Sequence, residues 1–307
     1  MKPRIRIIAA MAGLALAAGV TGWTPAGAAD ITSFEAKAQA EGGRFTFGAP
    51  GFVAVDTFID GGGPVAQSVL DGLGNSQSFA SLPYPSDNAI SGPGLVAGLT
   101  GLPSPPPYPF YVNSSYPTQD KATFTQPGLN LEATSSDVET AATAASGGGG
   151  GGSSVFSITS HTTSKKDDAT GSIIAEASTT ADMINIGGQL KIASGVVSAK
   201  VTRQAGGDPV RESAMRLDGV SIAGQAVGFN DKGFVFAGTG APIPPDNPLM
   251  QALRQAGIDV HYLAPVPDEN GIMSPGLVIT QTVQFPGSPK MIFTYVLGRA
   301  QAHATVS

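Results

Sequence analysis

Cysteine is absent from the 307-residue sequence, so the fold contains no disulfide and no thiolate can act as a nucleophile. Histidine is nearly absent: His161, His261 and His303 are the only three, and they share no metal-binding spacing such as HExxH. No GxSxG motif supplies a hydrolase serine. We therefore expect no metal site and no cofactor. The sequence favours a non-enzymatic protein while leaving enzymatic activity open.

Basic residues are also scarce, with 17 Lys and Arg against 23 Asp and Glu and a formal net charge of −6. They form no cluster, whereas the phosphates of a nucleic acid are bound by clustered Lys and Arg. We therefore expect no nucleic-acid partner.

Long apolar runs are missing beyond the first residues of the chain. Residues 1–29 combine a positively charged start, an apolar run at 7–20 and small residues at 26–28, which is the pattern of a secretory signal peptide. A membrane anchor is the alternative, but it needs about 20 apolar residues. We therefore predict cleavage, a mature chain without a membrane span, and a protein that is secreted, extracellular or associated with the cell envelope.

Alanine occupies every second position near both ends of the remaining chain, in FEAKAQAE (34–41) and GRAQAHAT (298–305). Ala, Glu, Lys and Gln favour helices, but a period of two places these alanines on one face only in a strand. We predict that both segments are strands with alanine facing inward.

The same alternation recurs at 173–186 and 190–202, which are joined by the turn signal Asn185–Gly188 and predict a long hairpin. Its odd-numbered positions 173–183 and 193–201 are expected to face inward. Shorter runs predict strands at 43–48, 52–59, 121–124, 129–135, 154–163, 214–222, 225–229, 233–237, 277–285 and 291–297.

One helix is expected, near 248–257. Asp246 or Asn247 can cap it, Pro248 suits its first turn, and Gly257 can end it. The fold class is therefore predicted to be all-β, an antiparallel β-sandwich or barrel-like sheet with one short helix.

Two segments interrupt the strand pattern. The stretch 146–154 is rich in glycine, and the stretch 82–117 is rich in proline and tyrosine; both are expected to be loops. We predict a signal peptide at 1–29 and a single β-rich domain at 30–307. The alternative is two β domains, 30–145 and 153–307.

The loop 82–117 carries four of the six tyrosines, Tyr84, Tyr108, Tyr111 and Tyr116. Tyrosine gives a large contact area at a low entropy cost, so these four residues are the candidate binding site. The alternative is an ordinary covering loop.

The segments GQLKIASGVVSAKV (188–201) and LDGVSIAGQAVGFNDKGF (217–234), a short helix ending near 256–258, and AQAHA (300–304) resemble exported actinobacterial β-rich proteins of unknown function. Some of these carry choice-of-anchor-type descriptions. The resemblance covers about residues 169–306. It implies a secreted or envelope-associated protein and brings no catalytic residues.

Two functions remain. The first is a secreted or cell-surface non-enzymatic β-protein with a structural or adhesive role. The second is a secreted carbohydrate-active hydrolase or carbohydrate-binding module. A hydrolase would need two carboxylates about 5–9.5 Å apart, and Asp56, Asp60, Asp268 and Glu269 are the acids to examine. The expected partners are cell-wall polysaccharide or another surface protein.

Overall fold

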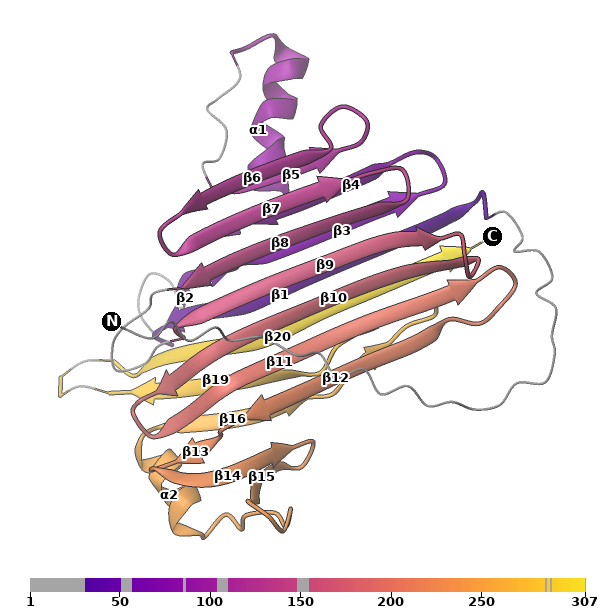
Figure 1. Ribbon diagram of the computed structural model, residues 1–307. Coiled ribbons are helices and arrows are strands. Elements are labelled where there is room, and N and C mark those ends of the chain that lie inside the picture. Colours follow the sequence, from indigo (N-terminus) through magenta and orange to yellow (C-terminus); the bar gives the residue numbers. More distant parts are fainter. Residues whose placement is uncertain are drawn as a thin grey trace, which may run out of the picture.

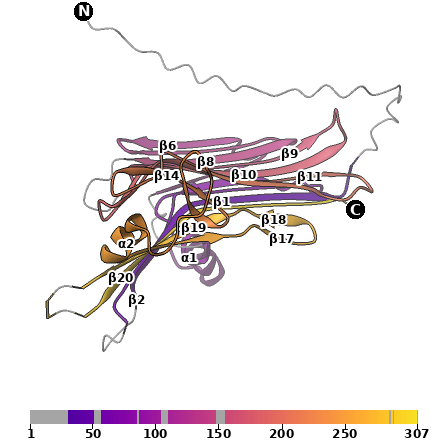
Figure 2. The same ribbon diagram turned by 90° about the horizontal axis from the view of Figure 1, so that it is seen from below.

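The computed structural model describes residues 31–50, 57–84, 87–103, 110–147, 155–284, 286–287 and 289–306. In this part of the chain, two antiparallel sheets pack face to face as a β-sandwich (Figures 1 and 2). The predicted all-β fold with antiparallel sheets is confirmed. The expected signal peptide and most of the glycine-rich tract lie outside the described residues.

The first sheet has ten strands, and its main path runs in the spatial order β16-β19-β20-β1-β3-β4-β5. Its strands are β1 (Phe34–Gly48), β2 (Thr57–Gly62), β3 (Val65–Asp71), β4 (Ser76–Ser81), β5 (Tyr111–Ser115), β16 (Ile258–Leu263), β17 (Val266–Pro267), β18 (Gly271–Met273), β19 (Gly276–Val283) and β20 (Met291–Val306). The strand expected at 52–59 is described only from Thr57, where β2 begins.

The second sheet also has ten strands, with the main order β15-β14-β13-β11-β10-β9-β8-β7-β6. Its strands are β6 (Lys121–Gln126), β7 (Leu129–Ser135), β8 (Glu139–Gly147), β9 (Ser157–Asp167), β10 (Ser172–Ile186), β11 (Leu190–Gln204), β12 (Val210–Asp218), β13 (Ser221–Ile222), β14 (Gln225–Asn230) and β15 (Gly233–Phe236). The predicted long hairpin is β10–β11. Because β8 pairs with β9, strands from both sides of the glycine-rich tract share this sheet.

The two alanine-rich segments near the chain ends are strands, β1 and β20, as predicted, and the structure shows that they are adjacent and antiparallel. Their register places Ala36 opposite Ala304, Ala38 opposite Ala302 and Ala40 opposite Ala300. All six side chains are buried, while the residues between them point to the outer face. Period two thus prevails over helix propensity, because burial of one face decides the conformation.

Small residues dominate the middle of the sandwich. One core cluster is built mainly from alanines of β1, β10, β11 and β20. Hydroxyl groups join the sheets beside it: Ser68 Oγ of β3 lies 2.9 Å from Ser164 Oγ of β9, and both residues are buried. A serine side chain is only two heavy atoms long. The sheets are therefore closer at this point than the roughly 10 Å usual for sandwiches.

Larger aliphatic residues fill one end of the sandwich, where β10, β11, β13, β19 and the helix α2 (Pro248–Gln255) meet. Between this end and the alanine core, the strands change which alternate positions face inward. Along β20, Leu297 and Ala300 are both buried; along β10, Ala181 and Ile184 are both buried. Gly298 and Met183 lie at the two changes and have left-handed backbone angles, with φ of +73° and +51°.

This change of face corrects two predicted inward positions. Met183 and Ala193 were expected to face the core, but both are exposed. The left-handed residue Met183 rotates the following part of β10, so Ile184 and Ile186 take the buried positions instead. Strict alternation cannot anticipate such a step, because a methionine with positive φ is uncommon.

The expected helix is α2. Asn247 caps it by accepting a hydrogen bond from the Leu249 N–H at 2.9 Å, and Leu253 is buried in the aliphatic cluster. The segment 82–117, however, is not only loop: it contains a second helix, α1 (Asp87–Thr100), and strand β5. Three glycines and Pro93 lower helix propensity in α1, which is why sequence patterns missed it.

Substitution of a core alanine tests the close approach of the sheets. We expect Ala302→Leu to lower the free energy of unfolding by about 1–3 kcal/mol, because the alanine core has no room for a larger side chain. Gln301→Leu, at the neighbouring outward position, should be nearly neutral. Urea denaturation of both variants measures the difference. Equal losses would contradict the assigned faces.

Gly298 permits a second test, at the change of face. A Cβ at Gly298 would lie 2.3 Å from Val197 Cγ2, whereas Gly188, with φ of +70°, has no atom within 4 Å of its Cβ position. Gly298→Ala should therefore cost about 2–4 kcal/mol, and Gly188→Ala, the matched control, about 1–2 kcal/mol. Thermal and urea unfolding measure both. Similar losses would show that backbone angle alone, and not contact with β11, requires glycine at 298.

Candidate functional site

The outer face of the first sheet carries a row of uncharged side chains, of which four are amides and one is the phenylalanine Phe79. The strand register aligns Gln301 with Gln39, Gln39 with Gln67, Gln67 with Phe79, and Phe79 with Asn113. These positions alternate with buried ones, so all five side chains lie on the same face. Adjacent strands are about 4.8 Å apart, and the row therefore extends for roughly 19 Å across five strands. We call it the amide row.

A second row runs beside the amide row, displaced by two residues along each strand. It consists of His303, Lys37, Val69, Gln77 and Ser115. The two rows together form a surface that is mainly uncharged and rich in groups able to donate and accept hydrogen bonds.

Two neighbouring hollows lie along these rows. The first, of about 510 Å³, spans β3, β4 and β5 and is lined by side chains that include Gln67, Gln77, Phe79 and Asn113. The second, of about 410 Å³, spans β20, β1 and β3. Both include Gln67, Ser68 and Val69 in their walls, so they join over β3. The result is an open, elongated site rather than an enclosed cavity.

Aromatic side chains border the first hollow. The rings of Phe79 and Tyr111 are stacked, with centroids 5.7 Å apart, and Tyr84 meets Phe79 edge-on at 6.0 Å. Gln67 Nε2 donates a hydrogen bond to the Tyr84 hydroxyl at 3.2 Å. This contact fixes an amide of the row against the aromatic group.

The structure therefore brings two of the four predicted tyrosines together, Tyr84 and Tyr111. Tyr116 is exposed just beyond β5, where its backbone N–H bonds to Ser76 O at 3.0 Å, and it does not line either hollow. Tyr108 lies outside the described residues.

The amide row itself was not recognised in the sequence. Gln39, Gln67 and Gln301 are far apart along the chain, and only the register of β1, β3 and β20 aligns them. The available signal was that glutamine occupies outward positions in several alternating segments.

The acids named from the sequence are not in this site. Asp268 and Glu269 lie in the turn between β17 and β18, where Asp268 Oδ1 accepts a hydrogen bond from the Asn270 N–H at 2.9 Å. Asp56 and the side chain of Asp60 lie outside the described part of the structure. Among the residues that line the two hollows, Glu35 is the carboxylate.

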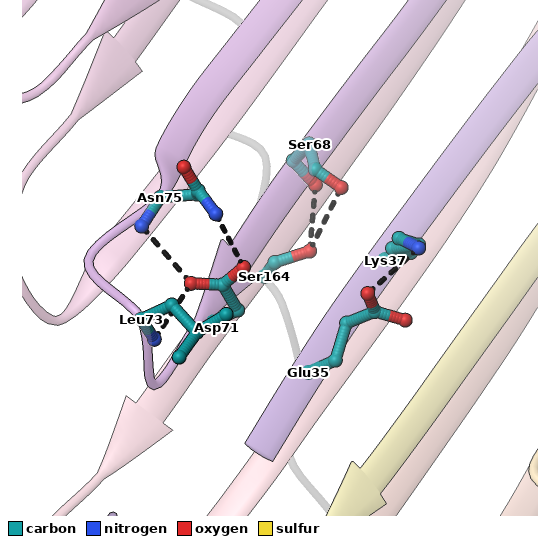
Figure 3. A network of polar contacts seen from close by, with 7 residues as sticks. All are labelled: Glu35, Lys37, Ser68, Asp71, Leu73, Asn75 and Ser164. Carbon is teal, nitrogen blue, oxygen red and sulfur yellow. Dashed lines mark hydrogen bonds and ion pairs between the residues drawn. The ribbon is translucent and has the colours of Figure 1, made fainter. Parts of the chain in front are cut away.

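Charges near the second hollow are paired. Lys37 Nζ lies 2.7 Å from Glu35 Oε2 on the outer face of β1 (Figure 3). Asp71, at the end of β3, accepts hydrogen bonds from the backbone N–H groups of Leu73 and Asn75 and, at 2.7 Å, from Asn75 Nδ2. These contacts hold the turn between β3 and β4 beside the site.

The pKa of Asp71 reflects this turn. Burial of the carboxylate would raise the pKa, but the hydrogen bonds from Asn75 and Leu73, together with the charge of Lys37, bring it below its ordinary value. The charged form is therefore favoured in the folded state.

The histidines do not gather into a metal site. His161 bonds to Thr143 and Thr163, His261 pairs with Asp259 at 2.6 Å on an exposed surface, and His303 lines the second hollow. In the described residues, no group of three or more His, Asp or Glu side chains is arranged to hold a metal ion. No helix of the described chain is long and apolar enough to cross a membrane.

Comparisons with known proteins add little. No family model and no curated protein matches the chain. The crystal structure of Pseudomonas aeruginosa OccK9 (OpdG) is 10% identical, with 90% of this chain and 99% of that chain covered and a TM-score of 0.18. The crystal structure of Acinetobacter baumannii OccAB4 is 7% identical, with 91% of this chain and 99% of that chain covered and a TM-score of 0.17. Similarity at these TM-scores carries no argument about fold or function.

The Asp71 turn gives a pH-dependent prediction. Because its folded-state pKa is lowered, Asp71 stabilises the fold above the unfolded-state pKa, and this contribution is lost as the pH falls through the folded-state value. Asp71→Asn should reduce stability at pH 7 by a few tenths of a kcal/mol, up to about 1 kcal/mol, since the turn is solvent-exposed.

Urea unfolding at pH 7 and at pH 2 measures this contribution. At pH 2, below the ordinary aspartate pKa of 3.8, the difference in the free energy of unfolding between Asp71→Asn and the unmodified chain should be smaller than at pH 7. Asp231→Asn, in the exposed turn between β14 and β15, is the control. A difference that stays constant with pH would contradict the role of the Asp71 charge.

Proposed function

We propose that this chain is an exported, non-enzymatic β-sandwich protein that adheres to an extracellular polysaccharide through the outer face of its first sheet. The observation that carries the proposal is the amide row, which crosses five strands beside the stacked rings of Phe79 and Tyr111. A sugar polymer presents hydroxyl groups at its edges and apolar C–H faces on its rings. Amides can pair with the hydroxyls, and aromatic rings can cover the faces.

The shape of the site fits an extended ligand. The two hollows join over β3, so a chain lying perpendicular to the strands can contact each strand in turn. A small molecule would require a deeper pocket that encloses most of its surface. The open rows favour a polymer, of which several units are bound weakly at the same time.

The charge of the site indicates an uncharged polymer. The first hollow is lined by Gln, Asn, Ser, Val, Phe and Tyr residues. In the second, the charge of Lys37 is offset by Glu35. An acidic polysaccharide would need unpaired cations, and a basic one would need unpaired carboxylates.

Hydrolysis is the weaker alternative. A glycosidase needs two carboxyl groups on either side of the scissile bond, one acting as acid and the other as nucleophile or base. Among the residues that line the hollows, Glu35 is the single carboxylate, and it forms an ion pair with Lys37. Binding without cleavage therefore accounts better for this surface.

Export and location are part of the proposal. They are supported by the signal-peptide pattern of residues 1–29. The resemblance to exported actinobacterial β-rich proteins stays a prediction.

Affinity electrophoresis in gels that contain uncharged polysaccharides tests the proposal. We expect at least one such polymer, in a panel that includes α- and β-linked glucans, mannans and xylans, to retard the protein. Gln67→Ala and Tyr111→Ala should each weaken binding about five- to tenfold, because each removes a hydrogen bond or a stacking surface.

Gln225→Ala is the matched control. Gln225 is exposed on β14 of the second sheet and lies outside both hollows, so its loss should leave retardation unchanged. Retardation by none of the polymers, or equal retardation of Gln67→Ala and the unmodified chain, would refute the proposal. Thermal unfolding confirms that each variant is folded.

A further inference from the structure

The second half of helix α1 presents its large apolar side chains to solvent. Leu95 and Leu99 are one turn apart and are 66% and 78% exposed, and Val96 beside them is 56% exposed. Leu102, just beyond the helix end, is 64% exposed. Ala97 is 4% exposed, so the small residue faces inward and the large ones face outward. This arrangement is the reverse of an ordinary surface helix, whose apolar stripe packs on the core.

The helix also stands apart from the sandwich. It projects beyond the end at which β5 and β6 lie (Figure 1). Gly101, with φ of +69°, ends the helix, and the Thr100 hydroxyl donates to Val96 O at 2.7 Å. The exposed side chains are therefore held on a terminated helix that the sandwich does not cover.

Charge is absent from the helix after its first residue, Asp87. Between Asp87 and Asp120 the sequence contains no Asp, Glu, Lys, Arg or His, although the chain as a whole carries 23 acidic and 17 basic residues. After Asp87, the helix is an apolar projection without charge, which is the composition of a segment that enters a lipid interface.

The exposed area argues against a protein partner. Stable protein interfaces bury about 800 Å² on each side. Leu95, Val96, Leu99 and Leu102 together expose only on the order of a few hundred Å². A second copy of this helix would therefore be held weakly. A bilayer needs no complementary surface, because each apolar group that enters it contributes separately.

We propose that α1 is a lipid-contact element, which inserts Leu95, Val96, Leu99 and Leu102 into the interface of an uncharged bilayer. The net negative charge of the chain disfavours an anionic bilayer, and residues 87–120 contain no Lys or Arg that could bind one. The helix lies on the interface and does not span the membrane. This proposal does not depend on polysaccharide binding, since no side chain is shared between the two surfaces.

A single tryptophan provides the test. Trp23 is the only tryptophan of the chain and lies in the predicted signal peptide, so the mature chain after residue 29 is a background in which a new tryptophan is the sole reporter. In that background we compare Leu99→Trp with Leu73→Trp. Leu73 is 91% exposed in the turn between β3 and β4, and it is the matched control for an exposed leucine outside α1.

On addition of phosphatidylcholine vesicles, the fluorescence of Leu99→Trp should shift to shorter wavelength, and brominated phosphatidylcholine should quench it. Leu73→Trp should change in neither way. The double variant Leu95→Glu/Leu99→Glu, which carries no reporter tryptophan, is compared with the unmodified chain by vesicle flotation. It should bind phosphatidylcholine vesicles at least about tenfold more weakly. The Leu73→Glu variant should float as the unmodified chain does.

Three results would overturn the proposal. One is that phosphatidylcholine vesicles leave the Leu99→Trp spectrum unchanged. Another is equal quenching at positions 99 and 73. The third is a blue shift that depends on protein concentration and not on vesicles, since it would show that a second copy covers α1. Loss of polysaccharide retardation with intact lipid quenching would refute only the function proposed above.

Discussion

The close approach of the two sheets is the constraint on which the rest of the fold depends. Alanine faces alanine between β1 and β20, and the Ser68 and Ser164 hydroxyls meet across the sheets. Small side chains bury little area each, so stability must come from the number of strands that pack in this way and from their ladders of hydrogen bonds. Ten strands in each sheet supply both, in a chain that has no cysteine for cross-linking.

The same constraint shapes the outer face. Where the inward positions are small residues, β1, β3 and β4 keep a continuous register, and their outward residues align in rows across the sheet. A bulge within β3 or β4 would break such a row. The regular core is thus the reason that Gln39, Gln67 and Gln301, which are distant in sequence, form one surface.

Alternation in the sequence was enough to predict an all-β antiparallel fold, the hairpin β10–β11 and the inward alanines of the first and last strands. It failed where the backbone leaves the regular conformation. Met183 adopts a left-handed angle, so the buried set of β10 moves by one residue. Helix α1 contains glycines and Pro93, which resemble a loop in composition. The amide row could not be predicted, because strand register is set by contacts between distant segments and not by local pattern.

The amide row and α1 lie near each other in the topology, and this bears on how two weak contacts can act together. Tyr111 begins β5, the edge strand of the first sheet, and α1 precedes that strand in the chain. A helix with two exposed apolar turns holds a bilayer only reversibly, as a single acyl chain does. A polymer bound on the adjacent face would keep α1 near any membrane to which that polymer is attached, and the local concentration of the helix would then be high. Each surface can therefore bind with modest affinity. Because the sandwich joins the two surfaces, binding through one raises the effective concentration for binding through the other.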